Sequence, residues 1–546
     1  MPEIITPPYY PIVYVRGYAA TMGEIEETVA TPYMGFNLGS TKIRRDYMGR
    51  PNKFIFESPL IRLMKDHGYI DTYVNGELVE PPMKLVGHDG KARTSELVPA
   101  RSIWIFRYYE QVSEELGTGE RQSIPYFAAD LRKFILDVRD AVCGDDAVAR
   151  DAFKVNLVAH SMGGLICRCY LQNICRSSSP PSDWDRNEDL KLNEGNLVHK
   201  VFTYGTPHNG IDVKGINVPD LGDLDKLETG TFNRGKMRKY LKIDDETDDD
   251  TDNETDDANS LDGAFDPNNF FCFVGTNYRD YGAFFGLSKK ATGPMSDGLV
   301  MCDNAYVKDA PRAFAHRAHS GPYGIVNSEE GFQNLRRFLF GDVRADVLLR
   351  IDDITLPRRV QKLRAEGHQI RASYQIESTA KVRGGNVVLH ERLAAHESAM
   401  FRRFEELVDN ARRMPIFLFS GFLDSGLKAA GSDDKYMAFA VSLAVKVPVY
   451  EVDKKFWFDE HFEGDDIFSE VFFFYVRFTD SGPQLRYSIR GTGEKEQKLK
   501  PLQPVEDPEF DVPVFKLPIG FKATAANKPP GRLSGEIILK GTRALA

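Results

Sequence analysis

The sequence predicts an α/β fold with a mostly parallel sheet, followed by a β-sandwich-like domain in the C-terminal part of the chain. Short apolar strands alternate with amphipathic helical patterns over the first part of the chain, which is the rhythm of a parallel sheet. Beyond about residue 345, period-two alternation of apolar residues dominates instead. We therefore expect two domains, residues 1–343 and 344–546, with insertions at about 17–100 and 208–268 in the first.

The predicted elements of the first domain follow from apolar periodicity and from residues that begin or end helices. Helices are expected where apolar residues recur every three or four positions, and Ser328 is an N-cap candidate for the last of them. The predicted strands are residues 11–15, 102–106, 154–159, 198–204 and 270–274, and the predicted helices are residues 125–142, 163–175 and 328–341.

The second domain is predicted to consist almost entirely of strands. The clearest is the stretch 437–447, in which apolar residues occupy every second position. One helix is expected at about residues 398–412. The predicted strands are residues 347–351, 370–376, 386–390, 437–447, 472–478, 485–489 and 533–539.

Composition and charge exclude several classes of protein. The 546 residues are 42% hydrophobic and 27% charged, which is typical of a globular chain with more than one domain. The formal net charge of −10 predicts no basic face for nucleic acid. No apolar run approaches the roughly 20 residues of a membrane-spanning helix, so no transmembrane segment is expected.

The N-terminus and the cysteines favour a cytoplasmic protein. The first residues have no basic region and are interrupted by prolines, so no secretion signal is visible. Six cysteines are sparse for this length and lack the spacing of a zinc ribbon. Three of them, Cys167, Cys169 and Cys175, fall in a predicted helix, where a small buried apolar role is expected. We therefore expect reduced thiols.

Acidic residues are concentrated between Asp244 and Asp257, inside the second insertion. So many like charges repel one another, and a flexible loop is expected. A calcium site is the alternative, because carboxylates alternate from Asp248 to Glu254 as in an EF-hand loop. However, Asn253 stands where that loop has glycine and Asn259 where it has glutamate. No metal site and no cofactor is therefore expected.

The strongest chemical signal is a serine between a predicted strand and a predicted helix. Ser161 follows the strand residues 155–159, and the small residues Ala159 and Gly163 flank it in the pattern Ala-x-Ser-x-Gly. A nucleophile elbow needs small residues there, because the backbone is strained and the helix must pack closely on the strand. Ser161 is therefore the candidate nucleophile, and the backbone amide of Met162 is a candidate oxyanion-hole donor.

Two motifs resemble the lipase and esterase branch of the α/β-hydrolase superfamily. One is Ala-His-Ser-Met-Gly-Gly at 159–164, and the other is Gly-Thr-Pro-His-Asn-Gly at 205–210, at the end of a predicted strand. The resemblance covers roughly residues 10–340 and does not extend to the second domain. It implies an α/β-hydrolase sheet and a second oxyanion-hole donor after an early strand. Here Arg16-Gly17-Tyr18 occupies that place, which makes the amide of Tyr18 the candidate.

In this fold the acid and then the base follow the nucleophile along the chain. Asp297 resembles the acid of lipases, because Asp297-Gly298 begins an Asp-Gly-x-Val segment, and Asp303 is its nearest competitor. The alternative role of Asp297 is to close an Asx turn.

His319 is the candidate base, because it begins a loop that leads to Ser328, and His316 is the alternative. His160 and His208 precede Asp297 and are therefore expected to line the pocket or to support it.

Together these residues predict a serine hydrolase that cleaves carboxylic esters through an acyl-enzyme intermediate. A phospholipase or acyltransferase with the same three residues is an alternative, and so is a catalytically silent hydrolase fold that serves as a binding module. The insertion after Gly210 carries Phe232, Met237 and Leu241 among cations, so it is either a packing helix or a cap that touches a lipid surface. The second domain is expected to be dispensable for the chemical step.

Overall fold

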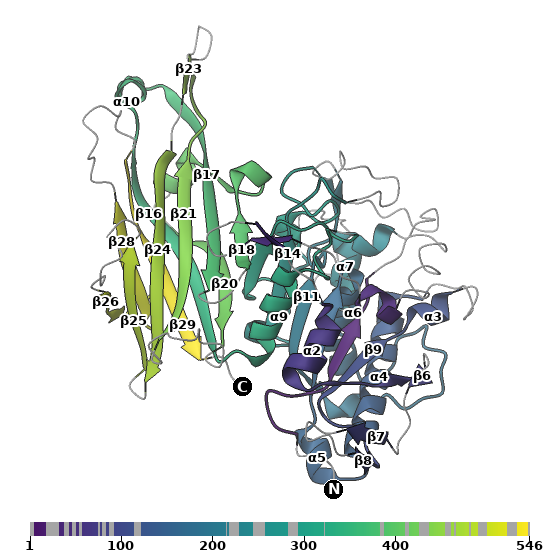
Figure 1. Ribbon diagram of the computed structural model, residues 1–546. Coiled ribbons are helices and arrows are strands. Elements are labelled where there is room, and N and C mark those ends of the chain that lie inside the picture. The colour runs from purple at the N-terminus through teal and green to yellow at the C-terminus, as the bar shows by residue number, and fades with distance from the viewer. Residues whose placement is uncertain are drawn as a thin grey trace.

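The structure is a computed structural model with an α/β part and a strand-rich part side by side (Figure 1). The described residues are 5–543 except 18–31, 38–42, 46–50, 54–56, 75–76, 79–82, 87–91, 114–121, 214–215, 218–228, 244–256, 282–292, 322, 383–386, 410–413, 425–435, 454–459, 464–465, 480–481, 490–498 and 521–531.

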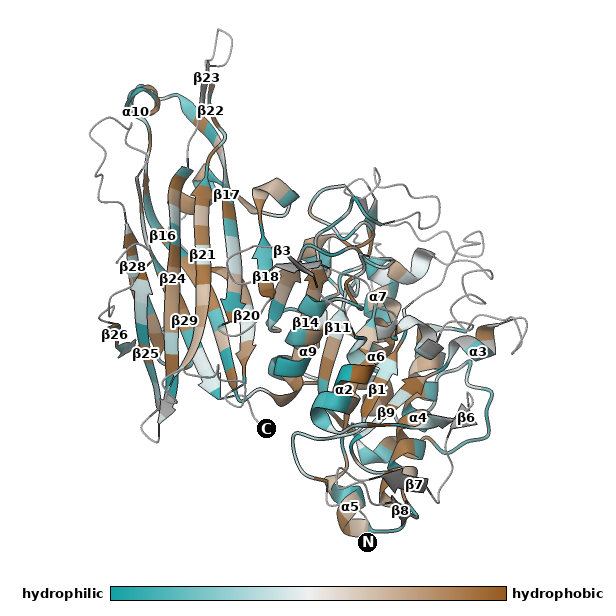
Figure 2. Ribbon diagram, in the orientation of Figure 1, coloured by the Kyte–Doolittle hydropathy of each residue, from teal (hydrophilic) through white to brown (hydrophobic). Residues whose placement is uncertain are grey.

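A seven-stranded sheet in which every neighbouring pair is parallel forms the centre of the first part. Its inner strands are buried along both faces, which explains their continuous apolar runs. Figure 2 shows this as brown along β1 and β14. In spatial order the strands are β15 (Arg312–Ala315), β14 (Phe270–Gly275), β11 (Val198–Tyr204), β10 (Val155–His160), β1 (Ile12–Val15), β9 (Ser102–Phe106) and β4 (Ile70–Asp71).

Helices with capped ends pack against this sheet. Ser123 Oγ accepts a hydrogen bond from the amide of Tyr126, and Ser328 Oγ accepts one from Gly331, so each serine begins its helix as an N-cap. The helices of this part are α2 (Pro59–His67), α3 (Tyr109–Val112), α4 (Ile124–Cys143), α5 (Ala147–Ala152), α6 (Met162–Gln172), α7 (Arg234–Leu241) and α9 (Glu329–Phe340).

The insertion at 17–100 is less separate from the sheet than expected. Its strand β4 joins the central sheet beside β9. The other strands described there form small hairpins, and one further hairpin lies in the second insertion. These strands are β2 (Ile43–Arg45), β3 (Pro51–Lys53), β5 (Tyr73–Val74), β6 (Glu77–Leu78), β7 (Met83–Val86), β8 (Ala92–Ser95), β12 (Asp212–Val213) and β13 (Ile216–Asn217).

The second part consists of two antiparallel sheets. A five-stranded sheet has the order β20 (Ile416–Leu423), β16 (Val343–Thr355), β29 (Arg532–Arg543), β28 (Val514–Gly520) and β27 (Pro504–Val505). A nine-stranded sheet contains β17 (Gln369–Val382), β18 (Val388–Arg392), β19 (Met400–Arg403), β21 (Met437–Lys446), β22 (Val449–Asp453), β23 (Glu460–Glu463), β24 (Asp466–Thr479), β25 (Gly482–Ile489) and β26 (Lys500–Leu502). The short helix α10 (Arg358–Ala365) precedes β17. The predicted fold class, a parallel α/β sheet plus a β-rich C-terminal part, is confirmed.

The predicted helix at 398–412 is wrong. Residues Met400–Arg403 form β19, which pairs antiparallel with β17, and among the described residues of this range the helical part is the short π-helical turn Glu405–Asp409 with Phe404 before it. A strand partner was available to this segment, and sheet hydrogen bonds outweighed its local helix preference. The edge strand β15 was not predicted at all, because its four residues are too few for a period to be visible.

The buried apolar residues form two clusters that divide near Val343. The first cluster ends at Leu339 along the chain and takes one member, Phe422, from β20 of the second part. The second cluster begins at Val343 and fills the space between the two antiparallel sheets. Among the described residues, no helix is long and apolar enough to cross a membrane.

We predict that the free energy of unfolding falls as the pH falls below about 6.5. Burial lowers the pKa of His67, His199 and His316 from 6.5 to about 4. Between these values the unfolded chain binds more protons than the folded chain, so stability is complete above about pH 6.5 and is lost progressively toward pH 4. In urea denaturation these three histidines together should contribute a loss of about 3–5 kcal/mol between pH 7 and pH 5.

The control for this prediction is His199→Gln, which replaces one titrating ring by an amide that stays neutral. The variant should lose about 1–2 kcal/mol less than the wild type over the same pH interval. Equal pH dependence in both proteins would contradict the assignment of that histidine.

Candidate active site

Ser161 sits at a sharp turn between β10 and α6, at the carboxyl edge of the parallel sheet. Its backbone is left-handed, with φ +53°, which is unusual for a residue other than glycine. The turn brings α6 so close to β1 that a Cβ on Gly163 would lie 2.5 Å from the carbonyl oxygen of Val15. The structure thus has the strained strand, turn and helix that the Ala-x-Ser-x-Gly pattern predicts.

A chain of two hydrogen bonds joins Ser161, His319 and Asp297. The Nε2 atom of His319 lies 3.0 Å from Ser161 Oγ, and its Nδ1 atom lies 2.8 Å from Asp297 Oδ2. With a proton on Nδ1, the imidazole donates to the carboxylate and accepts the serine hydroxyl proton. All three side chains are buried to 4% exposure or less. This arrangement allows the imidazole to take the hydroxyl proton while the carboxylate orients the ring.

Asp297 holds both its turn and the histidine. Its Oδ1 atom accepts hydrogen bonds from the amides of Leu299, at 3.0 Å, and Val300, at 2.8 Å, while Oδ2 faces the imidazole. The Asx turn and the histidine contact are therefore compatible roles for one carboxylate. Gly205 keeps this corner open, because its φ is +52° and a Cβ there would lie 2.9 Å from Asp297 Oδ2.

The alternative acid and base point elsewhere. Asp303 is exposed in a short 3-10 helix after the loop that carries Asp297. The ring of His316 stacks on His396 of the second part at 4.0 Å, and burial lowers the pKa of His316 to about 4.

Of the two candidate oxyanion-hole donors, Met162 is among the described residues and Tyr18 is not. Met162 is the first residue of α6, where backbone amides have no partner within the helix. Such an amide is free to donate to a developing negative charge beside Ser161. Tyr18 lies outside the described residues. Its neighbour Gly17 does approach the serine, since a Cβ on Gly17 would lie 2.5 Å from Ser161 Cβ.

His160 supports the histidine loop. Its Nε2 atom lies 3.0 Å from the backbone oxygen of His319, and the two rings are 4.9 Å apart. Burial holds the pKa of His160 well below its usual range, so the ring is neutral and Nε2–H donates to that carbonyl. Sequence order predicted only a supporting position for this residue.

The loop after β11 braces the serine turn. Thr206, in the Gly-Thr-Pro segment, donates a hydrogen bond from Oγ1 to the backbone oxygen of Ser161 at 2.8 Å. His208 is fully buried, with Nε2 3.1 Å from Thr203 Oγ1, and makes no contact with His319 that would give it the role of the base. The sequence motif indicated this loop but not the bond from Thr206.

The helix in the second insertion packs against the fold. Met237 and Leu241 of α7 are fully buried, and the backbone oxygen of Tyr240 accepts a hydrogen bond from Asn173 Nδ2, just after α6. The packing alternative is therefore the one that the structure favours for this helix. Residues 244–256 of the acidic run lie outside the described residues, and the described part of the chain contains no cluster of potential metal ligands.

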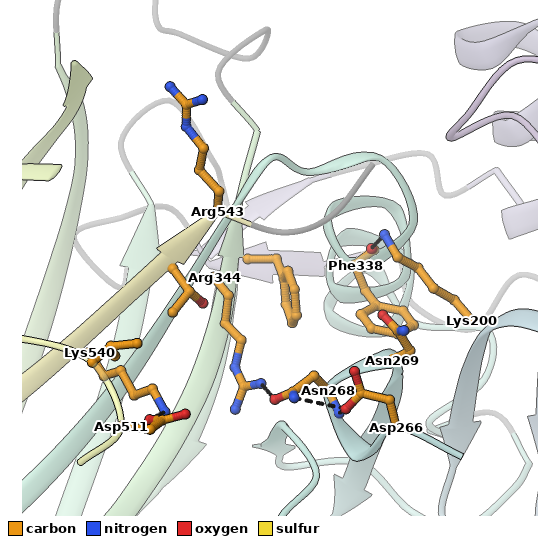
Figure 3. Close-up of a pocket in the computed structure, with 12 residues that line it drawn as sticks. Lys200, Asp266, Asn268, Asn269, Phe338, Arg344, Asp511, Lys540 and Arg543 are labelled. Carbon is orange, nitrogen blue, oxygen red and sulfur yellow. Dashed lines mark hydrogen bonds and ion pairs between the residues drawn. The ribbon is translucent and has the colours of Figure 1, made fainter. Parts of the chain in front are cut away.

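A cavity of about 190 Å³ lies between the two parts of the molecule (Figure 3). It is lined by Lys200 near the start of β11 and by residues 266–269 before β14, so it opens at the amino edge of the sheet. Two of its cations have polar partners: Arg344 donates to Asn268 at 2.6 Å, and Lys540 pairs with Asp511 at 2.7 Å. Because Ser161 is at the carboxyl edge, this cavity is not part of the candidate active site.

Comparisons with known proteins find similarity only at the level of solved structures. No protein-family model matches the chain, and no curated protein sequence matches it. The product of gene lin2722 from Listeria innocua is 12% identical with a TM-score of 0.24, covering 60% of this chain and 93% of that chain. Phospholipase PlaB from Legionella pneumophila is 11% identical with a TM-score of 0.29, covering 83% of this chain and 90% of that chain. The structure of phospholipase PlaB from Legionella pneumophila in complex with thio-NAD is 12% identical with a TM-score of 0.30, covering 96% of this chain and 99% of that chain. TM-scores this low carry no inference about function.

Proposed function

We propose that the protein is a serine hydrolase that cleaves carboxylic esters, as esterases and lipases do, through an acyl-enzyme intermediate. The observation that carries this proposal is the pair of hydrogen bonds that joins Ser161 Oγ to His319 and His319 to Asp297, at 3.0 and 2.8 Å. The left-handed backbone of Ser161 supports it, because strain of this kind persists where the surrounding structure imposes it and is concentrated at functional sites.

In the first half of the reaction, Ser161 Oγ attacks the carbonyl carbon of the ester while His319 Nε2 takes the hydroxyl proton. The carbonyl carbon becomes tetrahedral, and the amide of Met162 stabilises the oxyanion that forms. The bond to the alkoxy group then breaks, and His319 returns the proton to the departing alcohol. An acyl group remains on Ser161.

In the second half, water replaces the alcohol. The water oxygen attacks the acyl carbon while His319 takes a proton from the water. Asp297 stabilises the imidazolium that forms. The bond from the acyl carbon to Ser161 Oγ breaks, and the oxygen recovers its proton from His319. The products are the free carboxylic acid, the alcohol and the original enzyme.

We predict that Ser161→Ala, His319→Ala and Asp297→Asn each lower the turnover of a short chromogenic ester by about 10³–10⁶-fold. Double variants should lose little more than single ones, because the three groups act as a unit. Steady-state kinetics test this, with circular dichroism to show that each variant is folded.

Two matched controls accompany these variants. His199→Gln changes a histidine near the start of β11, at the opposite edge of the sheet, and Asp303→Asn changes the exposed carboxylate nearest in sequence to Asp297. Both should keep turnover within about threefold of wild type. Loss of activity in Asp303→Asn with full activity in Asp297→Asn would contradict the assignment of the acid.

We also predict that a chelator leaves ester hydrolysis unchanged, since none of the proposed steps uses a metal ion. The measurement is turnover of the same ester in ethylenediaminetetraacetate and after addition of excess calcium. A loss that calcium restores would instead assign an ion to the acidic run Asp244–Asp257.

The acyl preference is the second measurement that the proposal needs. A series of chromogenic esters from short to long acyl chains, with Ser161→Ala as the background, separates a lipase from an esterase. A wild-type rate equal to that background for every ester would contradict the proposed function.

A further inference from the structure

The second part of the molecule contacts the loops that carry Asp297 and His319. Two of its strands, β18 and β20, pack against β15 and α9 of the first part (Figure 1). Residues 390–398, which are the end of β18 and the turn after it, run beside the loop 293–302, which we call the acid loop because it contains Asp297. His319 follows the edge strand β15 by four residues. The loop that carries His319 also meets the 390–398 segment, because the ring of His316 stacks on that of His396.

His390 completes the edge of the central sheet. Its Nδ1 atom accepts a hydrogen bond from the amide of Phe314 in β15 at 3.2 Å, and its Nε2 atom lies 2.7 Å from Ser378 Oγ in β17. Burial holds the pKa of His390 well below its usual range, so the ring stays neutral and keeps the lone pair that accepts this bond. An unpaired amide at a buried edge is costly, so β15 depends on the second part for a partner.

Arg392 is buried between β15 and the acid loop. Its guanidinium lies 4.5 Å from the centre of the Phe314 ring, and its Nη2 atom lies 3.7 Å from Met295 Sδ. Its Nε atom donates to the backbone oxygen of Ser398 at 2.7 Å, which holds the side chain in this place. One side chain of the second part thus touches the acid loop and the strand before His319.

Met295 holds a strained conformation that the second part restrains. Its φ is +62°, and it lies two residues before Asp297. A left-handed backbone costs about 1–2 kcal/mol in a residue other than glycine, so it persists only where contacts impose it. The amide of Met295 donates to the backbone oxygen of Glu397 at 3.2 Å.

The carboxylate of Glu397 holds a third segment near the imidazole. It accepts hydrogen bonds from Tyr278 Oη at 2.6 Å and Arg279 Nη2 at 2.5 Å, and these bonds lower the pKa of Glu397. Two residues beyond Arg279, the ring of Tyr281 lies 5.6 Å from that of His319, at a steep angle. Glu397 therefore contacts the acid loop through its backbone, and through its side chain it contacts Tyr278 and Arg279, in the segment that leads to Tyr281.

We infer that Arg392 and Glu397 of the C-terminal part are positioning residues for the candidate acid and base, acting through Met295, Phe314 and Tyr278. This inference rests on the proposed function. It opposes the expectation that the C-terminal part is dispensable for the chemical step. Ser161, Met162 and Gly163 do not take part in these contacts, because they follow β10, which is paired on both sides within the central sheet by β1 and β11.

The expected consequence is a fall in kcat with little change in KM. Displacing a catalytic group by about 1 Å can lower turnover by about 10²-fold. We expect Arg392→Leu and Glu397→Ala in the full chain to lower kcat for a short soluble ester by about 10–100-fold, with KM within about threefold of wild type. Arg392→Lys keeps a cation over Phe314 and should recover part of kcat.

The matched control is Arg350→Leu, in the same part of the chain. Arg350 lies in β16 and pairs with Glu536 of β29 at 2.9 Å, without contact to the acid loop. This variant should lower the melting temperature as Arg392→Leu does and leave kcat at the wild-type value. Equal loss of kcat in both would show general destabilisation and would overturn the inference.

Glu397→Ala keeps the inference testable if Arg392→Leu does not fold, because Glu397 is only partly buried. Wild-type kcat in folded Glu397→Ala, or in both variants, would overturn the inference while leaving the proposed function intact. Labelling by a fluorophosphonate probe, in which a serine oxygen displaces fluoride from phosphorus, separates the two failures. A wild-type protein that neither hydrolyses the ester nor becomes labelled, with release of fluoride from the probe, would show that the proposed function itself is wrong.

Discussion

The left-handed backbone of Ser161 is the constraint on which the rest of the candidate site depends. The turn exists because β10 runs parallel to β1 and β11 and must reverse at once into α6. That reversal leaves no room for a side chain at Gly163, which faces the carbonyl oxygen of Val15. It also turns the serine hydroxyl toward the sheet edge where the other loops end. The bond from Thr206 to the backbone oxygen of Ser161 closes the turn from the neighbouring strand.

The parallel order of the strands explains why residues far apart in sequence meet there. Strands β10, β14 and β15 all end at one edge, so the loops that follow them share the same space. Asp297 and His319 follow Ser161 by well over a hundred residues and still form one hydrogen-bonded chain with it. The cavity at the opposite edge of the sheet lies at the interface between the two parts of the molecule and is not lined by these three residues.

The second part of the molecule covers β15, the edge strand of the central sheet. A parallel sheet that stopped at β15 would leave backbone amides unpaired beside the histidine loop. His390 supplies one acceptor, and Arg392 and Glu397 restrain the loops on either side. The contacts of His390, Arg392 and Glu397 therefore serve both the stability of the interface between the two parts and the geometry of the candidate site. On this proposal the reaction needs both parts of the molecule, although every proposed reacting group lies in the first.

By itself the sequence determined the elements whose signal is local: the strand, serine turn and helix around Ser161, the helix capped by Ser328, and the parallel α/β order followed by strands. It ranked Asp297 and His319 by order and loop composition, which are also local. Tertiary structure decided what depends on distant partners: the hydrogen bond that places His319 beside Ser161, the strand β15, and the formation of β19 beside β17 where a helix was expected. The 390–398 contacts belong to this second group, since no period or motif in one segment encodes the surface that another presents to it.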